Sequence, residues 1–551
     1  MSRILHITQC LTKGGAGRSL VATAKYSARL GAYQHKAISL VPVRDDIADI
    51  IRDTDLELVN APGQTQIFEE IQAADIVQVH FWNNPNIYEF LRSELPAMRL
   101  LVWVWVAAHS PPQVIIPQLV DYADITLGCS EYTCENSVFT KLSAETRNQK
   151  TGMVFGGTDF DRCTNFEKKP HRSFNIGYIG TVDFVKLHPQ YVRMSASINI
   201  PEIKIITVGR GRAQSELLQQ IDSLEKFPEF EFIDYLENIK PILEILDVFG
   251  YPLCEETYAA SELVLQEVMY CGIPPVVFPY GGLKHLVIHN ETGLIVANEL
   301  EYKQAIEYLY HHPEERQRLG ENARKYAHQH FGAKNAIQQL HPIYEKLLEQ
   351  PKRQRQWSTQ PRSGAECFVE SLGETAPHFR LSLTSQDTEV LLASEQQIAC
   401  SSPFVQRGIL NYVSHYSDDA NLNLWAGLIS QRLGQYSQAI SELSMAIALG
   451  CSHWRALWYL AQTAERAGDL GLARKTLLQL WASHPKMAVV RGTYTRLFNC
   501  PVSLLPQRFL LEKALNLLKV LVKSPKHFVK MSLMAIRDRF SILLTFSQFK
   551  Q

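Results

Sequence analysis

The stretch that decides the fold is residues 261–278, which read SELVLQEVMYCGIPPVVF. Apolar residues recur at helical spacing in its first half, which predicts a helix. Gly272 is the type of residue that commonly ends a helix, and the apolar run Pro275–Phe278 that follows predicts a buried strand. A helix that leads directly into a buried strand is one unit of an α/β sheet. One carboxylate, Glu267, lies inside the otherwise apolar helix.

The same alternation extends outward over residues 1–340. Short apolar runs without polar alternation are separated by amphipathic segments, and such strands are typical of a parallel sheet buried on both faces. We expect strands at Ile4–Ile7, Ala37–Val41, Ile76–Val79, Leu100–Val106, Ile125–Leu127, Ile176–Ile179, Lys204–Val208, Phe230–Ile233, Val248–Tyr251 and Pro275–Phe278. These are too many for one sheet of ordinary width. A polar seam near Arg162–Ser173 predicts two Rossmann-like domains, at 1–165 and 166–350.

The composition changes after residue 350. Residues 350–364 (QPKRQRQWSTQPRSG) lose apolar periodicity and collect Pro, Arg, Gln and Ser, which is typical of a linker. We predict a linker at 351–385 and an all-α module of helical repeats at 386–490. A protease is then expected to cut the linker first.

The helical module is predicted from an internal repeat with an offset of 34 residues. This period, with small residues where two helices approach, is typical of tetratricopeptide repeats, which would recruit a protein partner. An accidental match in a generic helical hairpin is the alternative. The pairs are Trp425 with Tyr459, Gly434 with Gly468, Tyr436 with Leu470, Ala439 with Ala473, Leu443 with Leu477, and Cys451 with Pro485.

Net charge and cysteine usage limit the class of protein. The formal net charge of −1 gives no field that favours nucleic acid, so we expect no nucleic-acid partner. The ten cysteines include no C-x-x-C pair and no zinc-type spacing, as in a reducing cytosol. Met1–Leu11 is predicted to be a first strand rather than a signal peptide. The strongly apolar run Leu100–Ala108 is too short for a spanning helix. A cytoplasmic protein is therefore expected.

The segment 491–551 is basic, with eleven Lys and Arg against two acids. Apolar residues lie between the cations, and Pro506 and Pro525 divide the segment into shorter helices. Basic amphipathic helices can rest on anionic lipid, which predicts peripheral contact with the inner face of the membrane. The alternative, which we favour slightly, is that the segment caps the repeats and its cations are solvated.

Glycine loops follow several of the predicted strands. The loop Lys13–Ser19 opens a helix, where backbone N–H groups and the helix N-terminus can approach a phosphate. Gly180–Lys186, Gly209–Gly211 and Gly281–Leu283 follow later strands, at the edge where parallel sheets bind ligands. Together with Glu267, these loops offer a cation, amides and a carboxylate. That set fits a diphosphate and a sugar or ribose hydroxyl.

This series resembles the retaining glycosyltransferases of the GT-B fold, specifically glycosyltransferase family 4, over roughly residues 1–350. The matching motifs are Gly14-Gly15, His109, Asp247-Val248-Phe249, the run Leu265–Pro274, Gly281-Gly282 and Glu291–Val296, which is similar to the family's "ETGLLV" hairpin. The resemblance implies two facing Rossmann-like domains. It also implies a hexosyltransferase that moves a sugar from a UDP- or GDP-sugar to the hydroxyl of a glycan or lipid-linked acceptor, with retention.

The resemblance also implies roles for individual residues. Lys186 would hold the donor diphosphate, Glu267 would bind donor hydroxyls, and His109 would face the transferred sugar. His80 and Arg18 would lie on the acceptor side. The resemblance implies that no metal is required, which agrees with the absence of an Asp-x-Asp pair in a suitable loop, and no cofactor is expected. The other donor-binding residues would be Gly14, Gly15, Gly180, Gly209, Arg210, Glu262, Gly281, Gly282 and Leu283.

Two positions depart from the family pattern. Thr181 stands where the family usually has arginine, and Ala259 stands where it has the partner of Glu267. Either the donor is held differently, with Arg210 or Arg18 contributing, or catalysis is weak or lost. A non-catalytic scaffold that binds a nucleotide or glycan is therefore the alternative function. A nucleotide-sugar epimerase of the same shape is less favoured, because the "ETG" hairpin follows transferases.

Structural roles compete with the site roles at three residues. Glu267 could form a salt bridge on its own helix, although a carboxylate among apolar residues more often has a function. Lys186 could be an ordinary surface lysine. For His80, a place in the acceptor cleft and a buried, hydrogen-bonded imidazole are equally expected.

Overall fold

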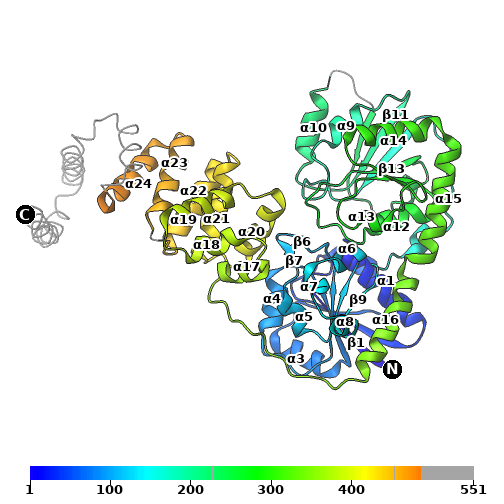
Figure 1. The fold of residues 1–551 in the computed structure, drawn as a ribbon, viewed down its shortest axis with the longest axis horizontal. Helices are drawn as coiled ribbons and strands as arrows, with labels where there is room; N and C mark the ends of the chain where they lie inside the picture. Colours follow the sequence, from blue (N-terminus) through cyan, green and yellow to red (C-terminus); the bar gives the residue numbers. More distant parts are fainter. Residues whose placement is uncertain (225–228, 452, 485–551) are drawn as a thin grey trace, which may run out of the picture. The chain divides into compact units, whose positions relative to one another are not determined.

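The computed structural model describes residues 1–224, 229–451 and 453–484. The chain divides into two compact units, Met1–Leu422 and a second that begins at Asn423. The first unit contains two parallel sheets, each with helices on both faces (Figure 1). The predicted α/β class and the two Rossmann-like domains are therefore confirmed.

The first domain is built on a parallel seven-stranded sheet of order β3-β2-β1-β4-β5-β8-β9. Side chains alternate along β1, so that Leu5 and Ile7 join the core on one face and Ile4 joins the core on the other. The strands are β1 (Ser2–Thr8), β2 (Tyr33–Ser39), β3 (Glu57–Asn60), β4 (Ile76–Phe81), β5 (Leu100–Val104), β8 (Ile125–Gly128) and β9 (Thr151–Met153). Its helices include α1 (Gly15–Arg29), α3 (Gln64–Ala73), α4 (Pro85–Arg92), α5 (Pro117–Tyr122) and α8 (Ala144–Lys150).

The second domain repeats this topology in a parallel six-stranded sheet of order β12-β11-β10-β13-β14-β15. The strand order reverses beside β10, where sheets of this type leave a crevice for ligands. The strands are β10 (Phe174–Ile179), β11 (Ile203–Val208), β12 (Glu229–Ile233), β13 (Val248–Tyr251), β14 (Pro275–Val277) and β15 (Leu294–Ile295). Its helices include α9 (Tyr191–Ala196), α10 (Gln214–Asp222), α12 (Leu263–Tyr270), α13 (Leu283–Leu286), α14 (Glu299–His311) and α15 (Pro313–His330).

Helix α16 (Ala333–Leu348) corrects the predicted end of the second domain at residue 350. Leu340, Tyr344 and Leu347 on α16 are buried in a core of the first domain, and Figure 1 shows the helix beside that domain. The chain thus crosses between the domains near residues 154–160 and again near 331–333. The two crossings touch, because Ala333 N donates to Thr158 O at 2.8 Å.

The predicted linker at 351–385 is wrong. Arg353 pairs with Met98 in a short β-bridge, and both Arg353 and Arg355 pair with the buried carboxylate of Asp124. Trp357 is buried in the core of the first domain. Two of the arginines that gave this stretch a linker-like composition, together with Trp357, therefore bind it to the domain.

Four helices, α17 (Gly364–Leu372) to α20 (Pro403–His415), follow within the first unit. The first two of them, α17 and α18 (Pro377–Thr384), lie within the predicted linker at 351–385. Helices α17 and α20 contact α4 of the first domain. Asn83 Nδ2 donates to Ser371 O at 3.2 Å, and Tyr412 OH donates to Asn83 Oδ1 at 3.0 Å. Helices α18 and α19 (Thr388–Ala399) pack against each other. The helical part is thus attached to the first domain from residue 364.

The last described helices begin at the expected spacing. They are α21 (Ala420–Arg432), α22 (Tyr436–Ala448), α23 (Trp454–Arg466) and α24 (Leu470–Ser483), so that α23 and α24 begin 34 positions after α21 and α22. The assignment to the tetratricopeptide class and its protein partner stays a prediction. The predicted basic segment 491–551 lies outside the described residues. Within 1–224, 229–451 and 453–484, no helix combines the length and the apolar character that a bilayer crossing requires.

Candidate active site between the two α/β domains

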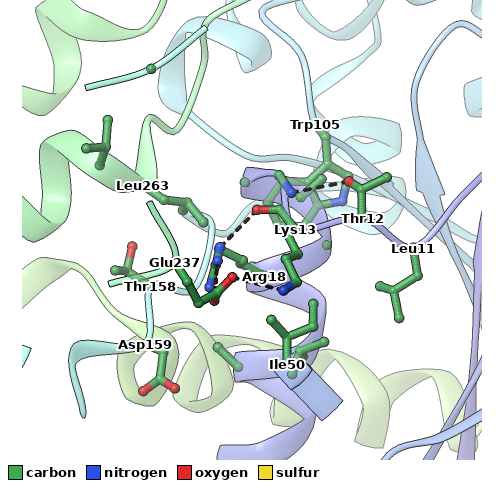
Figure 2. A pocket seen from close by; sticks show the side chains of 18 of the residues that line it. Leu11, Thr12, Lys13, Arg18, Ile50, Trp105, Thr158, Asp159, Glu237 and Leu263 are labelled. Carbon is green, nitrogen blue, oxygen red and sulfur yellow. Dashed lines mark hydrogen bonds and ion pairs between the residues drawn. The ribbon is translucent and has the colours of Figure 1, made fainter. Parts of the chain in front are cut away.

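A cavity of about 1010 Å³ lies between the two α/β domains of the first unit. Its lining comes from loops that follow the carboxyl ends of strands in both sheets. The sequence analysis placed the glycine loops at these ends. Figure 2 shows Lys13 and Arg18 from the first domain pointing toward Glu237 of the second. The predicted site residues in the lining are Gly14, Gly15, Arg18, His80, Gly180, Lys186, Gly209, Arg210, Glu262 and Glu267.

The first glycine loop is held tightly against its own strand end. Gly14 precedes helix α1, which begins at Gly15. A Cβ at Gly17 would lie 2.0 Å from Thr12 O, so no other residue fits there without moving the backbone. The loop therefore brings backbone N–H groups and the positive end of α1 to the cavity.

Two cations of this loop contact a carboxylate of the other domain. Arg18 Nη2 donates to Glu237 Oε1 at 2.6 Å, and Lys13 Nζ lies 3.1 Å from Glu237 Oε2. Burial by itself would raise the pKa of Glu237, but the hydrogen bonds and charges of Arg18 and Lys13 outweigh it and lower the pKa to about 2. Lys13 also lies 3.1 Å from Asp49 Oδ2. Glu237 stands in a loop without a motif, so no sequence pattern pointed to it.

Lys186 lies inside the cavity with only 8% of the residue exposed. Its Nζ is 2.7 Å from Glu262 Oε2, and Tyr251 OH donates to the same oxygen at 2.5 Å. Burial would lower the pKa of Lys186, but the nearby Glu262 carboxylate outweighs this and raises it. Lys186 is therefore a buried ammonium, and the surface-lysine interpretation is wrong.

Ala259 has no carboxylate to offer the cavity, whereas the carboxylate of Glu262 lies beside Lys186. Ala259 is buried, and its carbonyl accepts a hydrogen bond from Gly282 N at 3.0 Å. Glu262 stands directly before helix α12 and reaches Lys186. Thr181, the other departure, lies in the lining beside Gly180 but has no charge to offer a phosphate.

Glu267 is 4% exposed and pairs with a residue that the sequence did not indicate. Arg162 Nη1 donates to Glu267 Oε1 at 2.7 Å, while Arg162 Nη2 donates to Glu237 O at 2.7 Å. Burial raises the pKa of Glu267, and the charges of Arg162 and Arg18 oppose that shift. The salt bridge thus runs to the segment between the domains rather than along α12.

The two loops after β10 and β11 are in contact with each other. A Cβ at Gly209, whose φ is +140°, would lie 1.9 Å from Gly180 O, so this position requires glycine. The neighbouring Arg210 is bound to Asp234 through two hydrogen bonds and is exposed. Arg210 therefore lines the cavity as one member of an ion pair.

Four predicted site residues lie outside the cavity lining, and their roles at the site stay predictions. His109 Nε2 lies 2.7 Å from Tyr132 O because the chain after β5 turns away into the short hairpin β6 (His109–Ser110) and β7 (Gln113–Val114). Two of the three amides expected to face the donor are bonded inside the protein, because Gly282 N donates to Ala259 O and Leu283 N donates to Tyr280 O. The four residues are His109, Gly281, Gly282 and Leu283.

His80 borders the cavity but belongs to a buried chain of three imidazoles. Its Nδ1 accepts from Trp105 Nε1 at 2.9 Å. Because a neutral imidazole has a single acceptor, its Nε2 must carry the proton toward His6 Nδ1, 3.0 Å away. His6 Nε2 then donates to His35 Nδ1 at 2.9 Å. Both ring nitrogens of His80 are thus engaged, as in the buried-imidazole interpretation.

Burial lowers the pKa of all three histidines of this chain. The pKa of His80 falls to about 3, and that of His35 also falls to about 3, with a smaller contribution from His341. The pKa of His6 lies well below its usual value, first because of burial and then because of His35 and His80. The chain is therefore uncharged at neutral pH.

The carboxylates of Asp159 and Asp161 form an Asp-x-Asp pair in the cavity lining, although the sequence analysis identified no such pair in a suitable loop. Asp159 Oδ2 lies 2.8 Å from Lys25 Nζ, and Asp161 Oδ2 lies 3.0 Å from Lys25 Nζ and 3.1 Å from Arg29 Nη1. Both carboxylates are thus paired with cations of α1. Among residues 1–224, 229–451 and 453–484, no group of three or more His, Cys, Asp and Glu side chains is placed to hold a metal ion.

Comparisons with known proteins agree with this geometry. Residues 160–326 match the family described as glycosyl transferases group 1. The N-acetyl-alpha-D-glucosaminyl L-malate synthase of Bacillus anthracis is 25% identical over 153 residues, which is 27% of this chain and 39% of that protein. The D-rhamnosyltransferase WbpZ of Pseudomonas aeruginosa is 28% identical over 313 residues, which is 51% of this chain and 76% of that protein.

Solved structures match over the two α/β domains. The Anabaena protein Alr3699/HepE in complex with UDP and glucose has a TM-score of 0.51 and 18% identity, covering 63% of this chain and 100% of that one. A glycosyltransferase from Rickettsia africae has a TM-score of 0.51 and 14% identity, covering 63% of this chain and 99% of that one. At these identities the likeness shows the fold. The two α/β domains therefore have the GT-B fold, and residues 160–326 are similar to the glycosyl transferases group 1 family.

Proposed function

We propose that the chain is a glycosyltransferase that moves a sugar from a nucleotide-sugar donor to an acceptor hydroxyl. The observation that carries this proposal is the cavity of about 1010 Å³, into which Lys186, the Gly14-Gly15 loop and Glu262 converge from two domains. A buried ammonium beside amide-rich loops fits a diphosphate, and carboxylates fit sugar or ribose hydroxyls. UDP-sugars are the first donors to test, since the HepE structures hold UDP and UDP-glucose.

Stabilisation of the leaving group is the main catalytic task in this proposal. As the bond from the anomeric carbon to the diphosphate breaks, negative charge grows on the departing phosphate oxygen. Lys186 and the amides of the glycine loop neutralise that charge from fixed positions. Glu262 holds Lys186 in place through their 2.7 Å contact and has a second oxygen for a donor hydroxyl.

The finer assignment is also proposed. Transfer occurs with retention, as in glycosyltransferase family 4, and the departing phosphate oxygen helps to deprotonate the acceptor hydroxyl on the same face of the sugar. The transferred group is a hexose and the donor is a UDP- or GDP-sugar. The acceptor is a glycan or a lipid-linked glycan, and the protein acts in the cytoplasm at the inner face of the membrane.

The direct test is turnover of donors by the purified full chain. Release of nucleoside diphosphate from UDP- and GDP-hexoses is measured with and without glycan acceptors, and Lys186→Ala serves as the inactive control. Release that depends on Lys186 and increases with acceptor is the expected result. Absence of both nucleotide binding and release across these donors would reject the proposal.

A second candidate function is a non-catalytic scaffold that binds a nucleotide or glycan. It is supported by Thr181 and Ala259, which remove an arginine and a carboxylate that the family usually has. The ion pair between Lys186 and Glu262 also supports the scaffold, because a bound phosphate has to compete with Glu262 for the Lys186 ammonium. Tight nucleotide binding without any release of diphosphate would favour the scaffold.

A further inference from the structure

Helix α20 (Pro403–His415) contacts both α/β domains. Toward the first domain, Tyr412 OH donates to Asn83 Oδ1 at 3.0 Å, and a Cβ at Gly408 would lie 2.5 Å from the Pro112 ring. Toward the second domain, Arg407 Nη1 donates to Asp183 Oδ2 at 3.2 Å. One face of α20 therefore lies against the first domain while its arginine reaches the second.

Asp183 organises the turn that carries Lys186. Its Oδ1 accepts from Val185 N at 3.3 Å, and its carbonyl oxygen accepts from Lys186 N at 2.9 Å and from Leu187 N at 2.8 Å. Asp183 is buried. Because the other carboxylate oxygen faces Arg407, the guanidinium fixes the side chain that holds the turn.

A second contact between α20 and the second domain also lies close to Lys186. The rings of Phe404 and Tyr258 lie 5.7 Å apart between centroids. Tyr258 lines the cavity, and Lys186 Nζ lies 5.8 Å from the centre of its ring. These two contacts of α20 with the second domain therefore both lie close to Lys186. Arg407 contacts Asp183 in the backbone turn that precedes Lys186, and Phe404 contacts the ring of Tyr258 beside the Lys186 ammonium.

We propose that Arg407 is a positioning residue for the donor site, through which the helical segment after the α/β domains stabilises the turn that carries Lys186. The proposal rests on the proposed function, since it assigns Lys186 to the donor diphosphate. Arg407 acts through Asp183 and not on the donor itself. The family match ends at residue 326, so this contact comes from a part of the chain outside it.

The test uses full-length Arg407→Ala, Arg407→Glu and Arg407→Lys. Hydrogen exchange at the amides of Lys186 and Leu187 is measured without nucleotide, and the affinities for UDP and GDP are measured by calorimetry. We expect faster exchange and about two- to fivefold weaker binding in the alanine variant, a larger effect in the glutamate variant, and recovery with lysine. In turnover, KM for the donor should rise more than kcat falls, because the turn is loosened while Lys186 itself remains.

Two further variants separate positioning from a general loss of stability. Arg362→Ala removes an exposed arginine that pairs with Glu366 inside the same helical segment, and it should change neither exchange nor affinity. Asp183→Asn keeps the oxygen that accepts from Val185 and removes the charge, so adding Arg407→Ala to it should cause little further loss.

Unchanged exchange and affinity in a folded Arg407→Glu variant would overturn the proposal. Equal losses in Arg362→Ala would also overturn it, since the effect would then be a general one. If the wild-type chain binds no nucleotide, the proposed function fails, while the exchange measurement still decides whether Arg407 orders the turn. If Arg407→Glu does not fold, the alanine and lysine variants with Phe404→Leu make the same comparison.

Discussion

Arg18 of the first α/β domain donates a hydrogen bond to Glu237 of the second at 2.6 Å. The Glu237 carboxylate of the second domain thus forms an ion pair with Arg18 in the glycine loop of the first domain. A second cation of that loop, Lys13, has its Nζ 3.1 Å from Glu237 Oε2. In the proposed function the donor diphosphate binds beside this loop. Glu237 therefore neutralises positive charge that the diphosphate would otherwise attract, while it also joins the two domains.

The first prediction concerns this carboxylate. Glu237→Gln should bind nucleoside diphosphate about two- to fivefold more tightly, because Arg18 and Lys13 lose a competing negative charge that is partly exposed. Calorimetry with UDP and GDP measures the change, and salt should reduce it. Glu231→Gln, which removes a carboxylate paired with Lys204 on the same domain, is the matched control. Weaker binding in Glu237→Gln would show that domain contact matters more than charge competition.

The second prediction concerns the buried ammonium. Lys186→Ala should weaken nucleoside-diphosphate binding by about 1.5–3 kcal/mol, the usual value of a hydrogen bond to a charged group. It should also lower the melting temperature, because Glu262 is left buried without its cation. Adding Glu262→Gln should restore the melting temperature and leave binding weak. Lys284→Ala, which removes a partly exposed lysine outside the cavity lining, should leave affinity unchanged.

The third prediction is a loss of stability in acid. The pKa of His35 and that of His80 are lowered to about 3 in the folded protein, whereas an unfolded histidine titrates near 6.5. Between these values the unfolded chain binds more protons, so the free energy of unfolding should fall as the pH drops from about 6.5 toward 3. Urea unfolding followed by tryptophan fluorescence at pH 7.5, 6 and 5 measures this.

A single variant tests whether the histidine chain causes the acid effect. His35→Gln should reduce the pH dependence of unfolding relative to the wild type, since one buried titrating group is gone. His330→Gln, at an exposed position, should not. The same pH dependence in His35→Gln and the wild type would assign the acid effect to other groups.

The fourth prediction is that the stretch around residues 353–355 resists proteolysis, whereas a linker there would be cut first. Trypsin should spare the bonds after Arg353 and Arg355, because both side chains pair with the buried carboxylate of Asp124. Asp124→Asn leaves the mostly buried Arg355 without its anion, which should cost about 3 kcal/mol and open this stretch to trypsin. Asp121→Asn, at an exposed position nearby, is the control. Rapid cleavage after Arg353 in the wild type would favour the linker interpretation after all.

The sequence predicted the central strands well because they are apolar on both faces. All ten expected strands are present, although β2 begins and ends earlier than Ala37–Val41. The strands it missed are short: β3, β9 and β15 lie at the edges of the two parallel sheets, and β6 and β7 form a separate two-stranded hairpin. Periodicity gives little signal in strands of this length.

The site was predicted only where residues stand in motifs. Lys186, Glu262 and Glu267 lie in the cavity lining as expected. Glu237 and Arg162 had no signal, because each acts through a contact between segments that are far apart in sequence. The amide of Gly282 donates to Ala259 O, and the sequence does not show which amides are already bonded inside the protein.

The two chain crossings between the α/β domains have a mechanical consequence. They meet where Ala333 N bonds to Thr158 O, and a Cβ at Gly157 would lie 3.0 Å from Ala333 Cα. Two connections that touch at one place act as a single pivot: bending there changes a few backbone torsions, while twisting would have to break the contact between them. Any such bending would also have to break the Arg18–Glu237 and Arg407–Asp183 contacts, which join the two domains elsewhere. Small rotations at residues 157 and 333 are then amplified, in proportion to lever length, into a change in the width of the cavity.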